Sequence, residues 1–377
     1  MERLRRLLAQ PIVRDAMLWW LGSRLAILCI LAVVMLAFPD RVVPRPLHLY
    51  DAEFYTDIAD NGYKWNGDRT QKQNVGFFPL LPMVMRLMAV GGVPSDIGAT
   101  VLNNLLLLAT LMALGRLRGM SLSRRELNLL YFLLCFHPSS FYFSIPYTET
   151  LFLALAVMIF LTAERGRIAT CVILCFLAGL VRSNGWLCAA ALVLASFCDV
   201  ARCGVRWREF RLPLLAAAAG AAGLLSFLLY CHFQLGDFLA TVHAQRAWGH
   251  QSLRYHQAIV SSITGIVHTG RLMYWRILLD ALWLLATLPV ALGAWTSGRF
   301  SRPIAIFGIL ATAFPLIMLG GDEVRSTIRY QMVIFPTLAM LAIWCARWKW
   351  LLGIVGCLWV GLFTFFTGRV LLGEWVQ

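Results

Sequence analysis

Apolar segments of roughly 15–23 residues recur along almost the whole chain, and short polar turns separate them. A helix of about this length crosses the hydrocarbon core of a membrane. The residue-by-residue alternation of a membrane β-barrel strand is absent from the sequence. The pattern therefore predicts an all-α polytopic membrane protein with about eleven transmembrane helices. The predicted spans are 16–38, 97–114, 127–143, 147–163, 168–181, 186–198, 212–233, 273–295, 303–319, 330–346 and 350–371.

The longest polar interruption follows the first span, over residues 50–82. It opens with an amphipathic stretch in which apolar side chains recur at helical spacing, and Gly62 is a natural helix stop. We expect a short helix that begins near Asp51 and lies on the membrane surface. The apolar piece at 77–93 is broken by prolines and glycines. It is expected to lie along the interface instead of crossing the membrane. Its first part, 77–82, is expected to form the floor of a lipid groove, and the alternative is a simple interfacial anchor.

The composition agrees with this class of protein. Hydrophobic residues make up 60% of the 377 positions and charged residues 14%, with a mean hydropathy of +0.72. Soluble domains are about 45–50% apolar and about 25% charged. The net charge of +14 is explained by arginines retained on the cytoplasmic side, so no nucleic-acid partner is expected. The cysteines lie mainly in apolar segments, which indicates neither a disulfide framework nor a metal site.

The arginines also assign the two sides of the membrane. They are concentrated before the first span and in alternate turns, namely 116–125, 165–167, 202–211, 299–302 and 347–349. The positive-inside rule then places the N-terminus in the cytoplasm and the C-terminus outside. The first span is expected to be uncleaved, because its apolar run is longer than the core of a signal peptide. No repeat or linker divides the chain, so we expect one integral-membrane domain over 1–377. Its external segments would be 39–96, 136–149, 233–271 and 320–330.

Asp51 and Glu53 are the candidate catalytic residues at the head of the surface helix. An ionised carboxylate placed there can accept a proton from a hydroxyl as a general base. The alternative is that Asp51 caps the helix N-terminus and the other acids are solvated.

Later external segments supply candidate binding groups. Glu149 begins a span where the helix dipole favours an acid, so it either caps the helix or binds sugar hydroxyls. Arg182 and Arg329, the latter followed by Tyr330, can bind a phosphate through their guanidinium groups. The alternative for each arginine is that it extends toward lipid headgroups.

The 236–256 stretch of the loop 233–271 contains His243, His250 and His256, but their spacing lacks the compact ligand pair of a zinc site, and no metal is expected. Gln245 and Trp248 in this loop are candidate carbohydrate contacts, since an indole face stacks on sugar C–H groups. Asp280 lies deep in a predicted span, and a buried hydrogen bond between helices is its expected role.

The order of these motifs resembles that of the PIG-V family of mannosyltransferases, within the GT-C glycosyltransferase superfamily. The matching segments lie at 50–63, 77–82, 138–152, 182–185 and 329–330, and begin with Tyr-Asp, Phe-Phe-Pro, a proline-aromatic turn, Arg-x-Asn-Gly and Arg-Tyr respectively. Family members often have Trp where this chain has Tyr50, a difference that alters packing more than chemistry.

The resemblance implies a GT-C-like helix bundle and an inverting transferase without a cofactor. It implies a lipid-linked sugar donor, polyprenyl or dolichyl phosphate carrying mannose, and a glycan or glycolipid acceptor. Asp51 would be the base, with Glu53 as its rival, and Arg182 or Arg329 with Tyr330 would hold the lipid phosphate. The substrate contacts would come from Tyr55, His137, Tyr147, Glu149, Gln245 and Trp248.

The same pattern leaves two other functions open. A transporter or flippase of lipid-linked sugars would have ionisable residues near mid-membrane and repeated halves. A non-catalytic membrane subunit would retain the fold and act with a second protein. Short loops favour a prokaryotic cytoplasmic membrane with the site facing outside, and a eukaryotic protein of this kind would lie in the endoplasmic reticulum membrane.

Overall fold

The computed structural model describes residues 10–43, 47, 49–203, 207–248, 260, 263–268, 272–318 and 326–374. Within these ranges the chain forms helices and turns, with one isolated β-bridge between Met120 and Phe300. Five helices are long and apolar enough to cross a membrane. The prediction of an all-α polytopic membrane protein is confirmed.

The principal helices, in chain order, are α2 (Pro11–Ala37), α3 (Asp51–Asn61), α4 (Leu80–Val90), α5 (Ser95–Leu114), α6 (Arg124–Cys135), α7 (Glu149–Glu164), α8 (Ile168–Gly179), α9 (Leu187–Cys203), α10 (Trp207–Leu235), α11 (Ala240–Ala244), α13 (Leu272–Thr296), α14 (Arg302–Met318), α15 (Thr327–Gln331), α16 (Phe335–Arg347) and α17 (Lys349–Leu371). Short 3₁₀ helices lie at η1 (Pro39–Arg41), η3 (Asn74–Gly76), η4 (Ser140–Ser144) and η5 (Gln245–Trp248). The long apolar helices are α2, α5, α10, α13 and α17.

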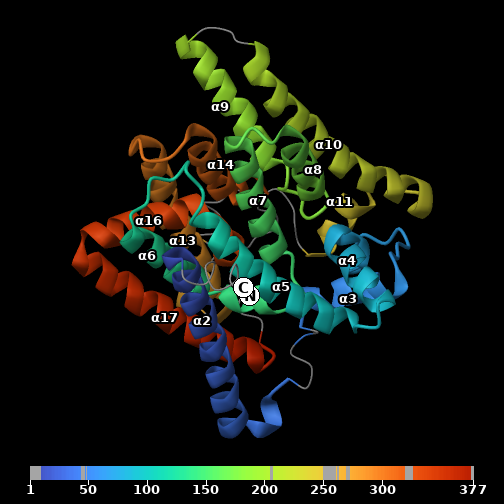
Figure 1. The fold of residues 1–377 in the computed structure, drawn as a ribbon. Helices are drawn as coiled ribbons and strands as arrows, with labels where there is room; N and C mark the ends of the chain where they lie inside the picture. The colour runs from blue at the N-terminus through green and yellow to red at the C-terminus, as the bar shows by residue number, and fades with distance from the viewer. Residues whose placement is uncertain are drawn as a thin grey trace.

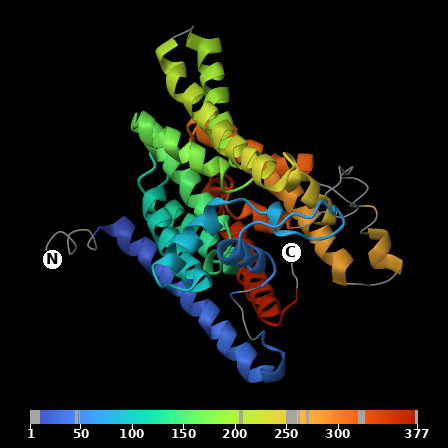
Figure 2. The ribbon, with the colours of Figure 1, turned by 90° about the vertical axis from the view of Figure 1, so that its right-hand side faces the viewer.

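The helices pack around a central group, with α6 against α16 and α5 against α7 (Figure 1). Helices α9 and α10 project together from one end, and α3 and α4 lie at one flank. The perpendicular view shows α2 as a long rod along the edge of the bundle (Figure 2). Glycines allow α8 and α10 to pack closely. A Cβ on Gly179 of α8 would collide with the backbone of α10, and a Cβ on Gly223 of α10 would collide with the backbone of α8.

Two predicted spans are wrong as continuous helices. The predicted span 127–143 ends as a helix at Cys135, because Pro138 lacks a backbone N–H and restricts the residue before it. The predicted span 330–346 is divided between α15 and α16, and Pro336 lies in the first turn of α16. The first break contains Tyr142 and Tyr147, and the second directly follows Arg329 and Tyr330, so both lie next to residues of the candidate site.

The predicted surface helix is present as α3, which ends at Gly62 with φ +82°. The proline-containing piece after it forms α4, whose 11 residues extend about 16 Å, too short to cross a membrane. Helix α4 packs against α3 and α5 through the fully buried Leu81 and Met85. Whether this segment lines a lipid groove stays a prediction.

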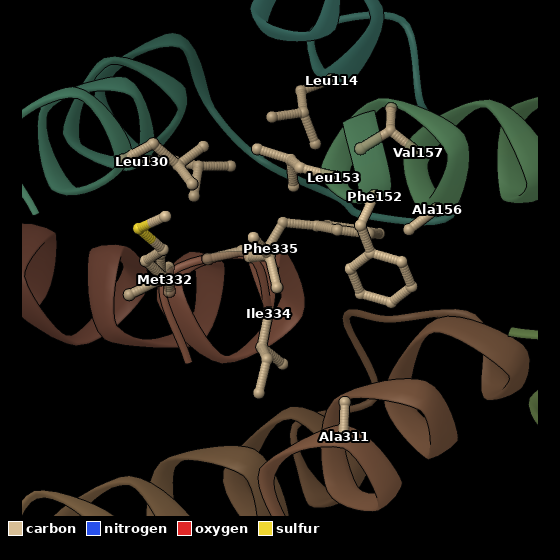
Figure 3. Close-up of a cluster of buried hydrophobic side chains, with 14 of the residues drawn as sticks. Leu114, Leu130, Phe152, Leu153, Ala156, Val157, Ala311, Met332, Ile334 and Phe335 are labelled. Carbon is tan, nitrogen blue, oxygen red and sulfur yellow. The ribbon is translucent and has the colours of Figure 1, made fainter. Parts of the chain in front are cut away.

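The hydrophobic core fixes the elements that carry the site. Figure 3 shows Met332, Ile334 and Phe335, which follow α15, beside Phe152 and Leu153 of α7. All five side chains are buried. The core therefore holds the start of α7 and the end of α15 in one arrangement.

Charged contacts join the first turn of α6 to α2 and to the segment before α14. Arg124 binds Asp15 of α2 with two nitrogens, at 2.7 and 2.8 Å. Glu126 accepts from Arg299 at 2.7 and 2.8 Å, and it also completes a capping box with Ser123. The hydrogen bond from Arg299 lowers the pKa of Glu126 to about 2.

Candidate active site

Helix α3 starts from a constrained backbone. Tyr50, the residue before it, has φ 53° and ψ −114°, a conformation uncommon for a large side chain. The N–H of Asp51 donates to the hydroxyl of Tyr147 at 3.1 Å, and that hydroxyl donates to the carbonyl of Leu49 at 3.2 Å. These two hydrogen bonds bracket Tyr50 and hold the carboxylate of Asp51 in place.

Tyr147 is itself fixed by the turn that contains it. Its side chain is buried, and burial raises the pKa of its hydroxyl well above the ordinary value, so the proton needed for donation is retained. Asn103 of α5 donates from Nδ2 to the carbonyls of Ile145 and Tyr147, at 2.6 and 3.0 Å. Tyr55, one turn into α3, places its hydroxyl 3.4 Å from Thr148 Oγ1. The 145–148 turn and α3 therefore form one connected unit.

Arg329 of α15 joins this unit to the C-terminal part of the chain. Its Nη1 lies 2.9 Å from Asp51 Oδ2, and its Nε lies 3.3 Å from Glu149 Oε1. The side chain is 6% exposed, against 16% for Asp51. A guanidinium so buried and so paired is not extended toward lipid headgroups, which removes that alternative for Arg329.

Glu149 is the most deeply buried acid of the cluster, with a side chain 1% exposed. Its Oε1 lies 3.3 Å from a nitrogen of Arg182 and from a nitrogen of Arg329. Neither carboxylate oxygen has a hydrogen-bond partner among the described residues, although Oε1 makes these two ion-pair contacts. Since nearly all buried polar atoms are hydrogen-bonded, Oε2 is suited to receive a donor from a bound molecule.

Arg182 reaches the cluster from the break between α8 and α9, and its side chain is 13% exposed. Gly185, three residues later, lies so close to the carbonyl of Ala178 that a Cβ there would overlap it. This close approach shapes the break and explains the glycine of the Arg-x-Asn-Gly motif.

Aromatic rings enclose the two guanidinium groups. The Cζ of Arg329 lies 5.1 to 5.4 Å from the ring centres of Tyr142, Tyr147 and Tyr330. The Cζ of Arg182 lies 5.1 Å from the Tyr330 ring. Such cation–π contacts stabilise a cation that has lost water. The cluster therefore holds two carboxylates and two guanidiniums, a balanced set of charges in a desolvated place.

The sequence-predicted site residues divide into those that the structure brings together and those, described below, that have other partners. The structure brings together Asp51, Tyr55, Tyr147, Glu149, Arg182, Arg329 and Tyr330. The hydrogen bonds that position Asp51 through Tyr147 and Asn103, and the ring of Tyr142, were missed by sequence reasoning. The density of aromatic and hydroxyl side chains in the 136–149 turn was a signal for Tyr142 and Tyr147, whereas no pattern pointed to Asn103 in α5.

The capping alternatives find no support at α3 and α7. The residues that precede these helices, Tyr50 and Thr148, make no side-chain capping hydrogen bond. The carboxylate of Asp51 instead faces Arg329. Glu53 is exposed, and among the described residues its side chain makes no hydrogen bond or ion pair with the cluster.

His137 and Gln245 have other partners. His137 is fully buried, with its ring 5.6 Å from the rings of both Trp283 and Trp359, and its Nδ1 accepts from the N–H of Ser139. Gln245 donates to the carbonyl of Gly76 at 2.8 Å and so joins η5 to η3, which lies between α3 and α4.

The remaining candidates fall partly outside the described residues. The backbone of Trp248 closes η5, but its side chain lies outside what the structure describes. Of the three histidines in the 236–256 stretch, His243 lies 2.7 Å from Asp237, and His250 and His256 lie outside the described residues. Within the described part of the chain, no group of three or more His, Cys, Asp or Glu side chains is placed to hold a metal ion.

The fold and the site together define a polytopic helical membrane protein with a desolvated carboxylate–guanidinium cluster where α3, α7 and α15 meet. The sequence profile of the family described as Mannosyltransferase (PIG-V) matches residues 38–232, which is more than half of the chain. The chain belongs to this family. The matched region includes Asp51, Glu149 and Arg182, whereas Arg329 lies beyond it.

A curated relative agrees with this placement. The chain is 28% identical over 226 residues to a GPI mannosyltransferase 2 of Drosophila pseudoobscura pseudoobscura. The match covers 53% of this chain and 47% of the relative, so the chain matches about half the length of that protein.

Proposed function

We propose that this protein is a membrane mannosyltransferase that moves mannose from a polyprenyl or dolichyl phosphate to a hydroxyl of a glycan or glycolipid acceptor. The observation that carries the proposal is the cluster of Asp51, Glu149, Arg182 and Arg329 in a chain of the PIG-V family. A base for the acceptor and cations for a leaving phosphate are the two requirements of this transfer, and both kinds of group meet here.

Asp51 is the proposed general base. Its carboxylate takes the proton of the acceptor hydroxyl, and the acceptor oxygen then forms a bond to the anomeric carbon. The bond between that carbon and the phosphate oxygen breaks, and the configuration inverts because attack and departure occur on opposite sides. The products are the mannosylated acceptor and the free lipid phosphate.

Arg329 and Arg182 are the proposed phosphate contacts. The phosphate of the donor carries one negative charge as a diester and gains a second one as it leaves. Guanidinium groups in a desolvated site therefore stabilise the transition state more than the bound donor. Arg329 is already paired with Asp51, so an incoming phosphate competes with this carboxylate for Arg329. Release from Arg329 would leave Asp51 free to accept a proton.

Glu149 and Tyr55 are the proposed sugar contacts near the base. The unpartnered Oε2 of Glu149 can accept a hydrogen bond from a sugar hydroxyl, and the Tyr55 hydroxyl lies beside Thr148. A substrate role for His137 would require it to leave its aromatic surroundings, so we do not assign it one.

The membrane placement is part of the proposal. We propose an integral protein with a cytoplasmic N-terminus and the cluster at the opposite face, in a prokaryotic cytoplasmic membrane or in the endoplasmic reticulum membrane. An epitope inserted in the exposed 66–72 segment tests this orientation, because it should be accessible from outside intact cells or from the lumen of microsomes. Labelling from the cytoplasmic side would contradict it.

The test of the activity uses purified protein in liposomes with a polyprenyl phosphomannose donor. Asp51→Asn is compared with Glu53→Gln, a matched loss of one carboxylate two residues away. We expect transfer to be lost in Asp51→Asn and retained in Glu53→Gln. Wild-type transfer by a folded Asp51→Asn protein would overturn the base assignment, and the opposite order would assign the role to Glu53.

A further inference from the structure

The helix that carries Arg329 is too short to be stable alone. Helix α15 has five residues and follows Ser326, whose φ of +60° is left-handed. Isolated helices of fewer than about 12 residues are marginal in water even with favourable sequences. The position of Arg329 must therefore come from what α15 packs against.

Asp280 of α13 holds the beginning of α15. Its side chain is buried, with the residue 4% exposed, and its Oδ1 accepts from the N–H of Ile328 at 2.8 Å. The backbone amides of Ser326 and Thr327 also donate toward this carboxylate. The first amides of a helix have no partner within the helix. A single carboxylate from a neighbouring helix thus satisfies the start of α15, directly beside Arg329.

A second contact from α13 holds the end of α15. Thr287 Oγ1 lies 2.6 Å from Gln331 Oε1, and Gln331 is buried. Asp280 and Thr287 are seven residues apart, two helical turns, so they lie on the same face of α13. This face of α13 contacts both ends of α15, while Arg329 between them pairs with Asp51 and Glu149.

We propose that Asp280 is a positioning residue for the transfer reaction, fixing α15 so that the guanidinium of Arg329 is held beside Asp51 and within reach of the donor phosphate that replaces it. The inference rests on the proposed function, since it gives Arg329 a phosphate to bind. Asp280 is not itself a catalytic residue, because its recorded hydrogen bonds are to the backbone of α15. It also differs from the exchangeable mid-membrane acid of a transporter, whose oxygens must be available to a proton or an ion.

The first test needs no substrate. Backbone hydrogen exchange of segment 326–331 is measured by mass spectrometry in the wild type, Asp280→Asn and Asp280→Leu. The asparagine keeps an oxygen that can accept from Ile328, and the leucine does not. We expect Asp280→Leu to accelerate exchange at 326–331 by about 10- to 100-fold, because this is the effect of losing a hydrogen bond to a charged group. Asp280→Asn should accelerate the exchange less. Unchanged exchange in a folded Asp280→Leu protein would overturn the proposal.

The second test couples Asp280 to Arg329. Donor kinetics are measured for Asp280→Leu and Arg329→Ala alone and together. If Asp280 acts through Arg329, Asp280→Leu lowers kcat/KM for the donor when Arg329 is present. The same substitution then has little further effect in a protein that already carries Arg329→Ala. Independent, additive losses would overturn the proposal. If the wild type transfers no mannose, the proposed function fails, while the exchange measurement still decides the role of Asp280.

A milder pair of variants addresses folding. Thr287→Val removes the contact with Gln331, and Thr296→Val is its matched control on α13. The hydroxyl of Thr296 bonds to carbonyls of its own helix, at Leu292 and Gly293. We expect faster exchange at 326–331 in Thr287→Val than in Thr296→Val. Equal exchange in the two variants would contradict a fixed α15 that depends on α13.

Discussion

The guanidinium of Arg329 lies 2.9 Å from the carboxylate of Asp51, across 278 positions of sequence. The pair joins α3, in the first third of the chain, to the short helix α15, in its last fifth. It also places the proposed base and a proposed phosphate contact within hydrogen-bond distance of each other. Each side chain is therefore expected to govern the behaviour of its partner.

Asp51→Asn should have opposite effects on phosphate binding and on transfer. Removal of the carboxylate charge leaves Arg329 more available, so polyprenyl monophosphate should bind several-fold more tightly. Transfer should fall by about 100- to 10,000-fold, the contribution of a general base. Binding is measured by titration of the lipid phosphate into protein in nanodiscs, with Glu53→Gln as the control. Weaker binding by Asp51→Asn would contradict competition for Arg329.

Arg329→Met should destabilise the protein as well as lower the rate of transfer. It leaves Asp51 and Glu149 in a desolvated place without their shared cation, and breaking a buried pair costs about 3–5 kcal/mol. Addition of Asp51→Asn should restore part of this stability, because Asp51 is the carboxylate left unpaired, whereas Glu149 keeps its contact with Arg182. Thermal unfolding in detergent measures both variants. A double variant less stable than Arg329→Met alone would show that charge balance is not the cause.

Tyr147→Phe tests the hydrogen bonds that bracket Tyr50. It removes the partner of the Asp51 N–H and of the Leu49 carbonyl, at an expected cost of about 1–3 kcal/mol. Tyr142→Phe is the matched comparison, since its buried hydroxyl has no hydrogen-bond partner among the described residues. Unfolding temperatures in the same detergent should fall for Tyr147→Phe and remain near wild type for Tyr142→Phe. The reverse order would be inconsistent with the role given to Tyr147.

Acid should weaken the contact between Glu126 and Arg299. The pKa of Glu126 is depressed from 4.5 to about 2, chiefly by the hydrogen bond from Arg299. A depressed pKa in the folded state gives stability that is fully present above the ordinary value and is lost as pH falls from about 4.5 toward 2. Glu126→Gln should remove this component, and Asp40→Asn, at an exposed acid, should retain it. Unfolding temperatures between pH 6 and pH 3 provide the measurement, and identical profiles for wild type and Glu126→Gln would refute the assignment.

Local pattern was sufficient for most helices. The start of α3 at Asp51 and its stop at Gly62 follow from apolar spacing and a glycine, both properties of neighbouring residues. The long apolar helices follow for the same reason. The same criterion failed at Pro138 and between Gln331 and Phe335. Apolar residues continue through both breaks, and hydropathy reports side-chain polarity but not whether the backbone remains helical.

By itself, the sequence determined the helical membrane fold, the family and most side chains of the candidate site, because periodicity, hydropathy and short motifs are local properties. Only the tertiary structure decided that Asp51, and not Glu53, faces Arg329, that Glu149 is shared by Arg182 and Arg329, and that Asp280 supports the backbone of α15. Such pairings join helices far apart in sequence. They depend on which faces the helices bury against one another, and no segment specifies that alone.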